Sequence, residues 1–145
     1  SVFGTYRTDW NSEHGTVMPQ KILRDVETAD KLFPDKRKLI HMMQPHHPFI
    51  DSDLPDSTAH PNAHKGQKVW ARAAKGEINK NDIWPEYRKN LEYVLPAVKE
   101  MTELLDGNTF VTEDHGNFVG ENGLYGHPSG SNAEVLRKVP WNNIS

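Results

Sequence analysis

The sequence contains no cysteine, no long apolar run and no excess of basic side chains. Without cysteine the chain can form no disulfide, thiolate nucleophile or cysteine-ligated zinc site. No apolar stretch approaches the roughly 20 residues of a transmembrane helix, and no signal peptide is visible, which favours a cytoplasmic location. The formal net charge of −3 comes from 17 basic and 20 acidic residues. This balance gives no support for a nucleic-acid partner.

Apolar residues are scarce for a chain of 145 residues. Hydrophobic residues make up 35% of the sequence, and Leu, Ile, Val and Phe together account for only 31 positions. The length suits one domain with a core of its own. Because the net charge is small, the composition predicts an ordered domain that is under-filled with apolar side chains. The chain begins at Ser1 and contains eight histidines, an unusual number for its size.

The order of periodic and polar segments predicts an α/β fold. Residues 1–17 are polar without periodicity and are expected to be irregular, whereas residues 19–33 carry a helical apolar stripe behind Pro19. Residues 38–43 read as a short buried strand, residues 45–65 as a proline-rich loop, and residues 66–76 as a polar helix. A helix over 84–105 and a strand over 108–112 follow.

The helix over 84–105 has the strongest pattern in the chain. Asp82 is a plausible N-cap, and Pro96 should kink the helix because it removes a backbone hydrogen bond. Its apolar positions form one continuous face that we expect to lie in the core: Trp84, Tyr87, Leu91, Val94, Leu95, Val98, Met101 and Leu105.

Polar clusters follow both predicted strands, at the edge of an α/β sheet where ligands bind. Asp114 and His115 come directly after the second strand, and a carboxylate beside an imidazole suits a divalent metal ion. The alternative is a plain turn at the end of a strand. His127 follows a glycine-rich stretch, residues 120–123, that can fold this histidine back toward His115.

The first strand is followed by the sequence PHHP at residues 45–48. Prolines restrict the backbone on both sides of His46 and His47, so these imidazoles can hold an oxyanion or ligate a metal, unless the segment is a simple surface turn. His41 lies within the strand and is expected to be a buried, hydrogen-bonded structural histidine. His60 and His64 lie in polar loop and are expected to be solvated.

Four segments resemble sulfatase-like members of the alkaline phosphatase superfamily, most closely archaeal sulfatase-like proteins. Residues 36–50 (KRKLIHMMQPHHPFI) look like the strand and PHxP loop of that family. Residues 109–121 (TFVTEDHGNFVGE) are similar to its DHG segment. Residues 123–128 (GLYGHP) and 139–141 (VPW) resemble the loop and strand that follow. The segments occur in the family's order over residues 36–141.

The resemblance implies a metal-dependent hydrolase of sulfate esters. It assigns Asp114 and His115 as metal ligands, His46 as a contact to the transferred group, and His127 as a contact to substrate or metal. The implied cofactor is a divalent ion (Ca, Zn, Mg or Mn), and the implied partner is a sulfate- or phosphate-ester substrate, carbohydrate esters included. Alternatives are a phosphomonoesterase or phosphodiesterase of the same superfamily, and a non-catalytic binding module that retains the fold.

The chain departs from the family in lacking any segment like the half that carries the nucleophile. We therefore expect residues 1–145 to form a single partial domain, the C-terminal part of an α/β/α sandwich. A formylglycine nucleophile is excluded within the chain because cysteine is absent. Residue 117 is Asn where the family usually has an acidic residue. The parent protein is expected to be an ester hydrolase and the isolated chain to be inactive.

Overall fold

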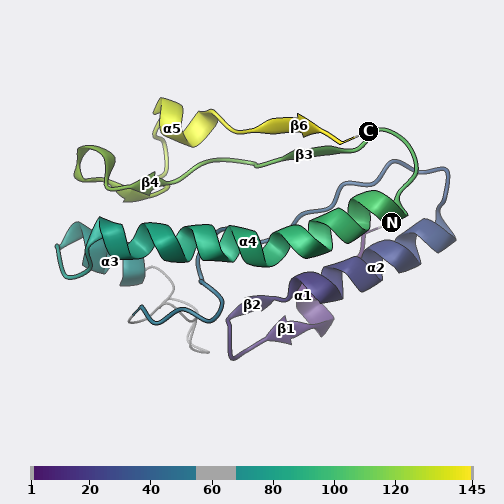
Figure 1. Cartoon of the computed structure of the whole chain (residues 1–145), viewed down its shortest axis with the longest axis horizontal. Coiled ribbons are helices and arrows are strands. Elements are labelled where there is room, and N and C mark those ends of the chain that lie inside the picture. Colours follow the sequence, from purple (N-terminus) through teal and green to yellow (C-terminus); the bar gives the residue numbers. More distant parts are fainter. Residues whose placement is uncertain (1, 55–67, 145) are drawn as a thin grey trace.

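The computed structural model describes residues 2–54 and 68–144 of the chain (Figure 1). The elements in chain order are α1 (Thr5–Thr8), β1 (Trp10–Asn11), β2 (Thr16–Val17), α2 (Pro19–Leu32), α3 (Lys68–Ala74), α4 (Lys80–Leu104), β3 (Phe110–Thr112), β4 (Phe118–Val119), η2 (Glu121–Gly123), β5 (Tyr125–Gly126), α5 (Glu134–Arg137) and β6 (Trp141–Asn143). The predicted mixed α/β character is confirmed. Helix α4 runs through the middle, with α2 along one side and the β3–β6 ribbon along the other (Figure 1).

The two shorter predicted helices are confirmed within the described residues. Helix α2 begins at Pro19, whose missing N–H is not needed in a first turn, and it buries Ile22 and Val26 as the stripe predicts. It ends where the N–H of Phe33 donates to the carbonyl of Ala29 at 2.9 Å. The helix predicted over 66–76 is α3, Lys68–Ala74, while positions 66 and 67 lie outside the described residues.

Helix α4 begins four residues earlier than the sequence predicts. Its N-cap is Asn79, not Asp82, because the side chain of Asn79 accepts a hydrogen bond from the N–H of Asn81 at 2.8 Å. The helix continues as one element through Pro96. Proline leaves the carbonyl of Glu92 without its helical donor, but both residues are exposed, so water can serve that carbonyl.

The buried face of α4 is rotated from the predicted one. Val94 and Met101 are buried as expected, but Trp84 is 58% exposed and Leu95 is 47% exposed. The buried positions of the helix are Ile83, Asn90, Val94, Ala97 and Met101. These buried positions recur at helical spacing, as a helix with one buried face requires. The prediction placed the centre of that face on the bulkier side chains beside it.

Two apolar clusters pack against opposite halves of α4. The first, the α2–α4 cluster, joins α2 to the C-terminal half and contains Val17, Ile22, Val26, Ala97 and Met101. The second, the α3–α4 cluster, joins α3 to the N-terminal half and contains Phe49, Val69, Ala73, Ile78 and Ile83. Phe49 belongs to the loop at residues 45–50, so the second cluster connects the helices to the segment that carries His46.

The predicted strand over 38–43 is wrong as an element. The segment forms no strand, although every second side chain along it is half-buried. Among the described residues no neighbouring strand pairs with it, and a strand is defined by its partner. The strand predicted over 108–112 is β3, which pairs antiparallel with β6 so that Thr112 lies opposite Trp141.

The amino-terminal residues are more regular than the expected coil. Residues 1–17 include α1 and the antiparallel pair β1–β2, in which Trp10 lies opposite Val17. The carboxylate of Asp9 pairs with Arg24 of α2 at 2.9 Å and with Lys21 at 3.4 Å, which fastens this segment to the helix. In the part of the chain that the structure describes, no helix is both long and apolar enough to cross a membrane.

Ile83 tests the rotated face of α4. It is fully buried in the α3–α4 cluster, so Ile83→Ala is expected to lower the free energy of unfolding by about 2–5 kcal/mol. Leu95→Ala on the exposed side of the same helix is the matched control and should cost less than about 1 kcal/mol. Urea unfolding followed by circular dichroism measures both. Equal losses would contradict the observed burial.

Candidate functional site

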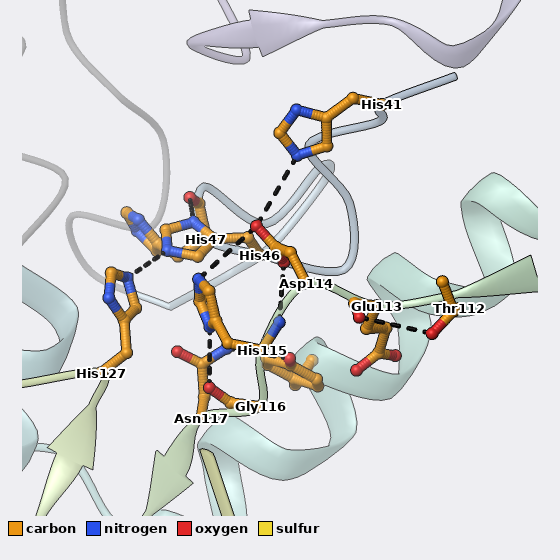
Figure 2. Close-up of polar contacts among 11 residues, drawn as sticks. His41, His46, His47, Thr112, Glu113, Asp114, His115, Gly116, Asn117 and His127 are labelled. Atoms are coloured by element: carbon orange, nitrogen blue, oxygen red, sulfur yellow. Dashed lines mark hydrogen bonds and ion pairs between the residues drawn. The ribbon is translucent and has the colours of Figure 1, made fainter. Parts of the chain in front are cut away.

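Three loops bring His46, His115 and His127 together (Figure 2). His46 belongs to the loop at residues 45–50, His115 to the turn after β3, and His127 follows β5 directly. The Nε2 atoms of His46 and His127 are 2.9 Å apart, although the residues are 81 positions apart in sequence. Ring centroids lie 4.5 Å apart for His115–His127 and 6.4 Å for His46–His115. The predicted return of His127 toward His115 is confirmed.

The hydrogen bond between His46 and His127 has a definite direction when both rings are neutral. The Nδ1 atom of His46 contacts the carbonyl oxygen of His47, and a carbonyl can only accept. Nδ1 of His46 therefore carries the proton, and its Nε2 accepts from the Nε2–H of His127. His127 is thus the member of the pair whose Nε2–H can turn to another acceptor.

The loop that carries His46 is held by the side chain of Asn90, which is fully buried on α4. Its Nδ2 group donates to the carbonyls of Pro45 and His46 at 3.1 Å each, and contacts that of Pro48 at 3.3 Å. Its Oδ1 accepts from the N–H of Ile50 at 3.1 Å. One amide therefore satisfies backbone groups along the whole loop, which fixes where His46 points.

His47 does not share the position of His46. Its ring is 3% exposed and packs edge-on against Phe49 and Trp70, with centroids 5.3 and 6.4 Å away. The peptide bonds Gln44–Pro45 and His47–Pro48 are both cis. Of the two adjacent histidines, His46 faces the site and His47 anchors the loop in the α3–α4 cluster.

Two glycines allow the other loops to approach closely. A Cβ atom at Gly116 would lie 2.1 Å from the carbonyl oxygen of Val135, so only glycine fits against α5 at that position. Gly126 has φ of +71°, and a Cβ there would meet the ring of Trp70 at 3.3 Å. These contacts place His115 and His127, each of which is next to one of the glycines.

Asp114 and His115 have the chemistry of metal ligands. Nδ1 of His115 lies 2.9 Å from the carbonyl oxygen of Gly116, so it donates there and leaves Nε2 with a lone pair. Asp114 accepts the N–H of His115 on Oδ1, and its Oδ2 lies 3.9 Å from Nε2 of His115. Two ligands of one tetrahedral ion are about 3.4 Å apart, so this pair fits a divalent ion after a small adjustment.

Asp114 and His115 do not by themselves complete the coordination of a metal ion. Within residues 2–54 and 68–144, no group of three or more His, Asp or Glu side chains has an arrangement that could hold a metal ion. Asp114 and His115 therefore supply two donors, and an ion there would need its remaining ligands from other sources.

His41 is a correction to the sequence prediction. It was expected to be buried, but its side chain is 72% exposed, and its Nε2 lies 3.8 Å from Oδ2 of Asp114 (Figure 2). The reason is that burial alternates along residues 38–43, and His41 occupies one of the exposed positions. His41 therefore joins the site from the side opposite His115. His60 and His64, expected to be solvated, lie outside the described residues.

Charge and burial shift two groups at the site. Burial lowers the pKa of His127, and the neighbouring imidazoles of His46 and His115 lower it further, while the carboxylate of Asp114 opposes them. Burial also raises the pKa of Glu113, as does the adjacent carboxylate of Asp114, against a smaller opposite effect of His115. Near neutral pH, His127 is therefore a neutral donor and not a fixed cation.

Sequence reasoning missed two residues that position the site. Asn90 occurs within the apolar stripe of α4, seven residues after Ile83 and four before Val94, and a polar residue in such a stripe signals a buried hydrogen-bonding role. Tyr87 was assigned to the core, but its hydroxyl oxygen accepts from Nδ2 of Asn117 at 3.0 Å. The half-buried Tyr87 thereby ties the turn after β3 to α4.

Asn90→Ala is expected to lower the free energy of unfolding by about 2–4 kcal/mol, because it leaves buried backbone groups of the His46 loop unpaired. Asn81→Ala, at an exposed asparagine near the start of the same helix, is the control and should change stability by less than about 0.5 kcal/mol. Urea unfolding measures stability, and the ring signals of His46 in NMR spectra report its position. An unchanged His46 signal in Asn90→Ala would contradict the positioning role.

The pKa of His127 is expected to lie below the ordinary histidine value of about 6.5. His46→Gln should raise that pKa because it removes a neighbouring positive charge, whereas Asp114→Asn should lower it because it removes a compensating carboxylate. An NMR titration of the His127 ring protons measures both shifts, with His14→Gln as a control outside the cluster. Shifts of the opposite sign would refute the electrostatic account.

Similarity to known proteins adds nothing to this geometry. Comparison with family models, with curated proteins and with solved structures finds no match for the chain. The chemistry of the site is therefore argued from its own residues: three converging imidazoles, one exposed carboxylate and the backbone contacts that hold them.

Proposed function

We propose that this chain is part of a metal-dependent hydrolase of sulfate esters. The observation that carries the proposal is the 2.9 Å contact between Nε2 of His46 and Nε2 of His127, beside Asp114 and His115. These are the four positions to which the sulfatase-like resemblance assigns ester and metal contacts. Their convergence from three separate loops is what that assignment requires.

We further propose that the chain is the C-terminal part of a sulfatase-like α/β/α sandwich. The order of the PHHP, DHG and VPW motifs supports this fold, and so does the antiparallel pairing of β3 with the strand that begins at Trp141. On this proposal the nucleophile lies outside residues 1–145, and the chain alone does not turn over aryl sulfates.

The two paired imidazoles suit a tetrahedral oxyanion. In the neutral pair the Nε2–H of His127 donates to His46, and it can donate instead to an ester oxygen that enters between the rings. Hydrogen bonds to charged groups contribute about 1.5–3 kcal/mol each, so the pair can hold the group that is transferred.

His127 is placed to donate a proton to a leaving-group oxygen. Its neutral ring can donate only a hydrogen bond, because loss of the remaining N–H proton would leave an imidazolate. Proton transfer requires the imidazolium form of His127, which burial makes a stronger acid by lowering its pKa and which returns to the neutral ring when the oxygen takes the proton. His46 is held more rigidly, because the carbonyl of its own residue is bound by Asn90. We therefore assign His46 to orientation of the ester and His127 to proton transfer.

Asp114 Oδ2 and His115 Nε2 are the atoms that would bind a divalent ion. Such an ion polarises an ester oxygen and neutralises the charge that develops on it. The orientation of Asp114 is set by the N–H of His115, and that of His115 by the carbonyl of Gly116. These two backbone contacts keep the donor atoms on the side of His46 and His127 (Figure 2).

The proposal is tested by titrating the chain with manganese and, separately, with sodium sulfate while NMR spectra are recorded. Asp114→Ala is expected to weaken manganese binding by at least about tenfold and to leave the sulfate response in place. His46→Gln is expected to do the reverse, and His14→Gln, outside the cluster, should change neither response.

Unchanged manganese affinity in Asp114→Ala would overturn the metal assignment. The absence of any sulfate-dependent shift at His46 and His127 would overturn the oxyanion assignment. A markedly larger response to inorganic phosphate would replace sulfate esters by phosphate esters as the substrate class. Turnover of aryl sulfates by the isolated chain would show that the nucleophile lies within it.

A further inference from the structure

His41 contacts Asp114 on the side away from His115. Its Nε2 atom lies 3.8 Å from Oδ2 of Asp114, and Nε2 of His115 lies 3.9 Å from the same oxygen. Figure 2 shows the carboxylate of Asp114 between the two rings. Within residues 2–54 and 68–144, no three His, Asp or Glu side chains are arranged to hold one metal ion. His41 is therefore placed to contact the metal ligand Asp114 and not the ion itself.

The two carboxylate oxygens of Asp114 have different partners. Oδ1 accepts the N–H of His115 at 3.0 Å, whereas Oδ2 faces the Nε2 atoms of both histidines. A carboxylate oxygen has two lone pairs, so Oδ2 can bind an ion with one and accept a hydrogen bond with the other. An ion between Oδ2 and Nε2 of His115 would leave unused the side of Oδ2 that His41 faces (Figure 2).

The ring of His41 can donate that hydrogen bond. A carboxylate oxygen only accepts, so contact with Oδ2 of Asp114 favours the form of His41 that carries a proton on Nε2. The observed 3.8 Å is longer than a hydrogen bond of about 3 Å, so the two atoms must approach by roughly 1 Å. Both side chains have room to turn that far, because that of His41 is 72% exposed and that of Asp114 is 68% exposed.

The backbone of His41 is held in place by its two neighbours. Ile40 and Met42 pack against the α2–α4 cluster. Burial alternates along this segment, so the side chain between them faces outward, where it meets Asp114. Packing thus fixes the position from which the ring starts, and only the side-chain torsions remain to adjust.

We propose that His41 is a positioning residue for the metal ligand Asp114, an inference that rests on the metal site of the proposed function. The Nε2–H of His41 donates to Oδ2 of Asp114 and keeps the remaining lone pair of that oxygen directed toward Nε2 of His115. Hydrogen bonds from outer groups orient metal-binding carboxylates in this way, and their loss lowers metal affinity by about 10–100-fold.

The inference is tested by titrating the full chain with zinc, which is diamagnetic, while NMR follows the nitrogen signals of the histidine rings. His41→Leu removes the donor and is expected to weaken zinc binding about tenfold. His41→Gln keeps an N–H donor and should retain the affinity to within about threefold. Leu39→Gln, at an exposed position two residues earlier, is the matched control and should bind zinc as the unchanged chain does.

The ring signals separate a positioning residue from a metal ligand. On zinc binding, the Nε2 signal of His115 should shift as that of a nitrogen that binds metal, whereas Nε2 of His41 should keep its proton. A metal-binding shift at Nε2 of His41 would overturn the inference. Equal weakening of zinc binding by His41→Leu and His41→Gln would overturn it too.

Asp114→Ala in the same titration distinguishes this inference from the proposed metal site. Weaker zinc binding in Asp114→Ala together with unchanged binding in His41→Leu would overturn the role of His41 and leave the metal pair in place. Unchanged zinc binding in both variants would overturn the metal pair as well.

Discussion

The carboxamide of Asn90 joins the helical scaffold to the loop that presents His46. Its contacts reach from Pro45 to Ile50, and they use both the donor and the acceptor ends of the amide. A side chain with two rotatable bonds, buried on a long helix, holds such a loop at small entropic cost. Because the amide is fully buried, its own polar atoms must find their partners within the protein, and this loop supplies them. The direction of the His46 ring therefore depends on α4.

The same helix controls the other loops less directly. Tyr87, one turn before Asn90, holds Asn117 and through it the turn with Asp114 and His115. The loop with His127 is supported by the contact of Gly126 with Trp70, whose ring also packs on Phe49. Tyr87 and Trp70 pack against the α3–α4 cluster, and Asn90 binds the backbone on both sides of Phe49, a member of that cluster. The site is thus an extension of one apolar cluster, while the α2–α4 cluster serves the far half of the helix.

Much of the local structure can be predicted from the sequence, because it depends on residues that are close together along the chain. Pro19 and the stripe through Ile22 and Val26 specify α2, and glycine-rich residues 120–123 specify the return of His127. The strand expected at residues 38–43 was wrong because pairing depends on a partner that no local pattern contains. The structure brings His46, Asp114, His115 and His127 together, as motif order led us to expect, and their chemical roles stay predictions. The burial of His41 was predicted wrongly, because the overall fold and not the local sequence decides which side of this unpaired segment faces the core.

The exposure of the four tryptophans gives the protein an internal optical reporter. Trp10, Trp84 and Trp141 are all more than half exposed, whereas the indole of Trp70 is wedged between Gly126 and the ring of His47. An indole in apolar surroundings emits at shorter wavelength than one in water, so the light from Trp70 is spectrally separable from that of the other three. It lies beside Gly126, the neighbour of His127, and beside the ring of His47, the neighbour of His46, without belonging to the cluster. Any rearrangement of His46 or His127 is therefore transmitted to a chromophore that the chain already contains.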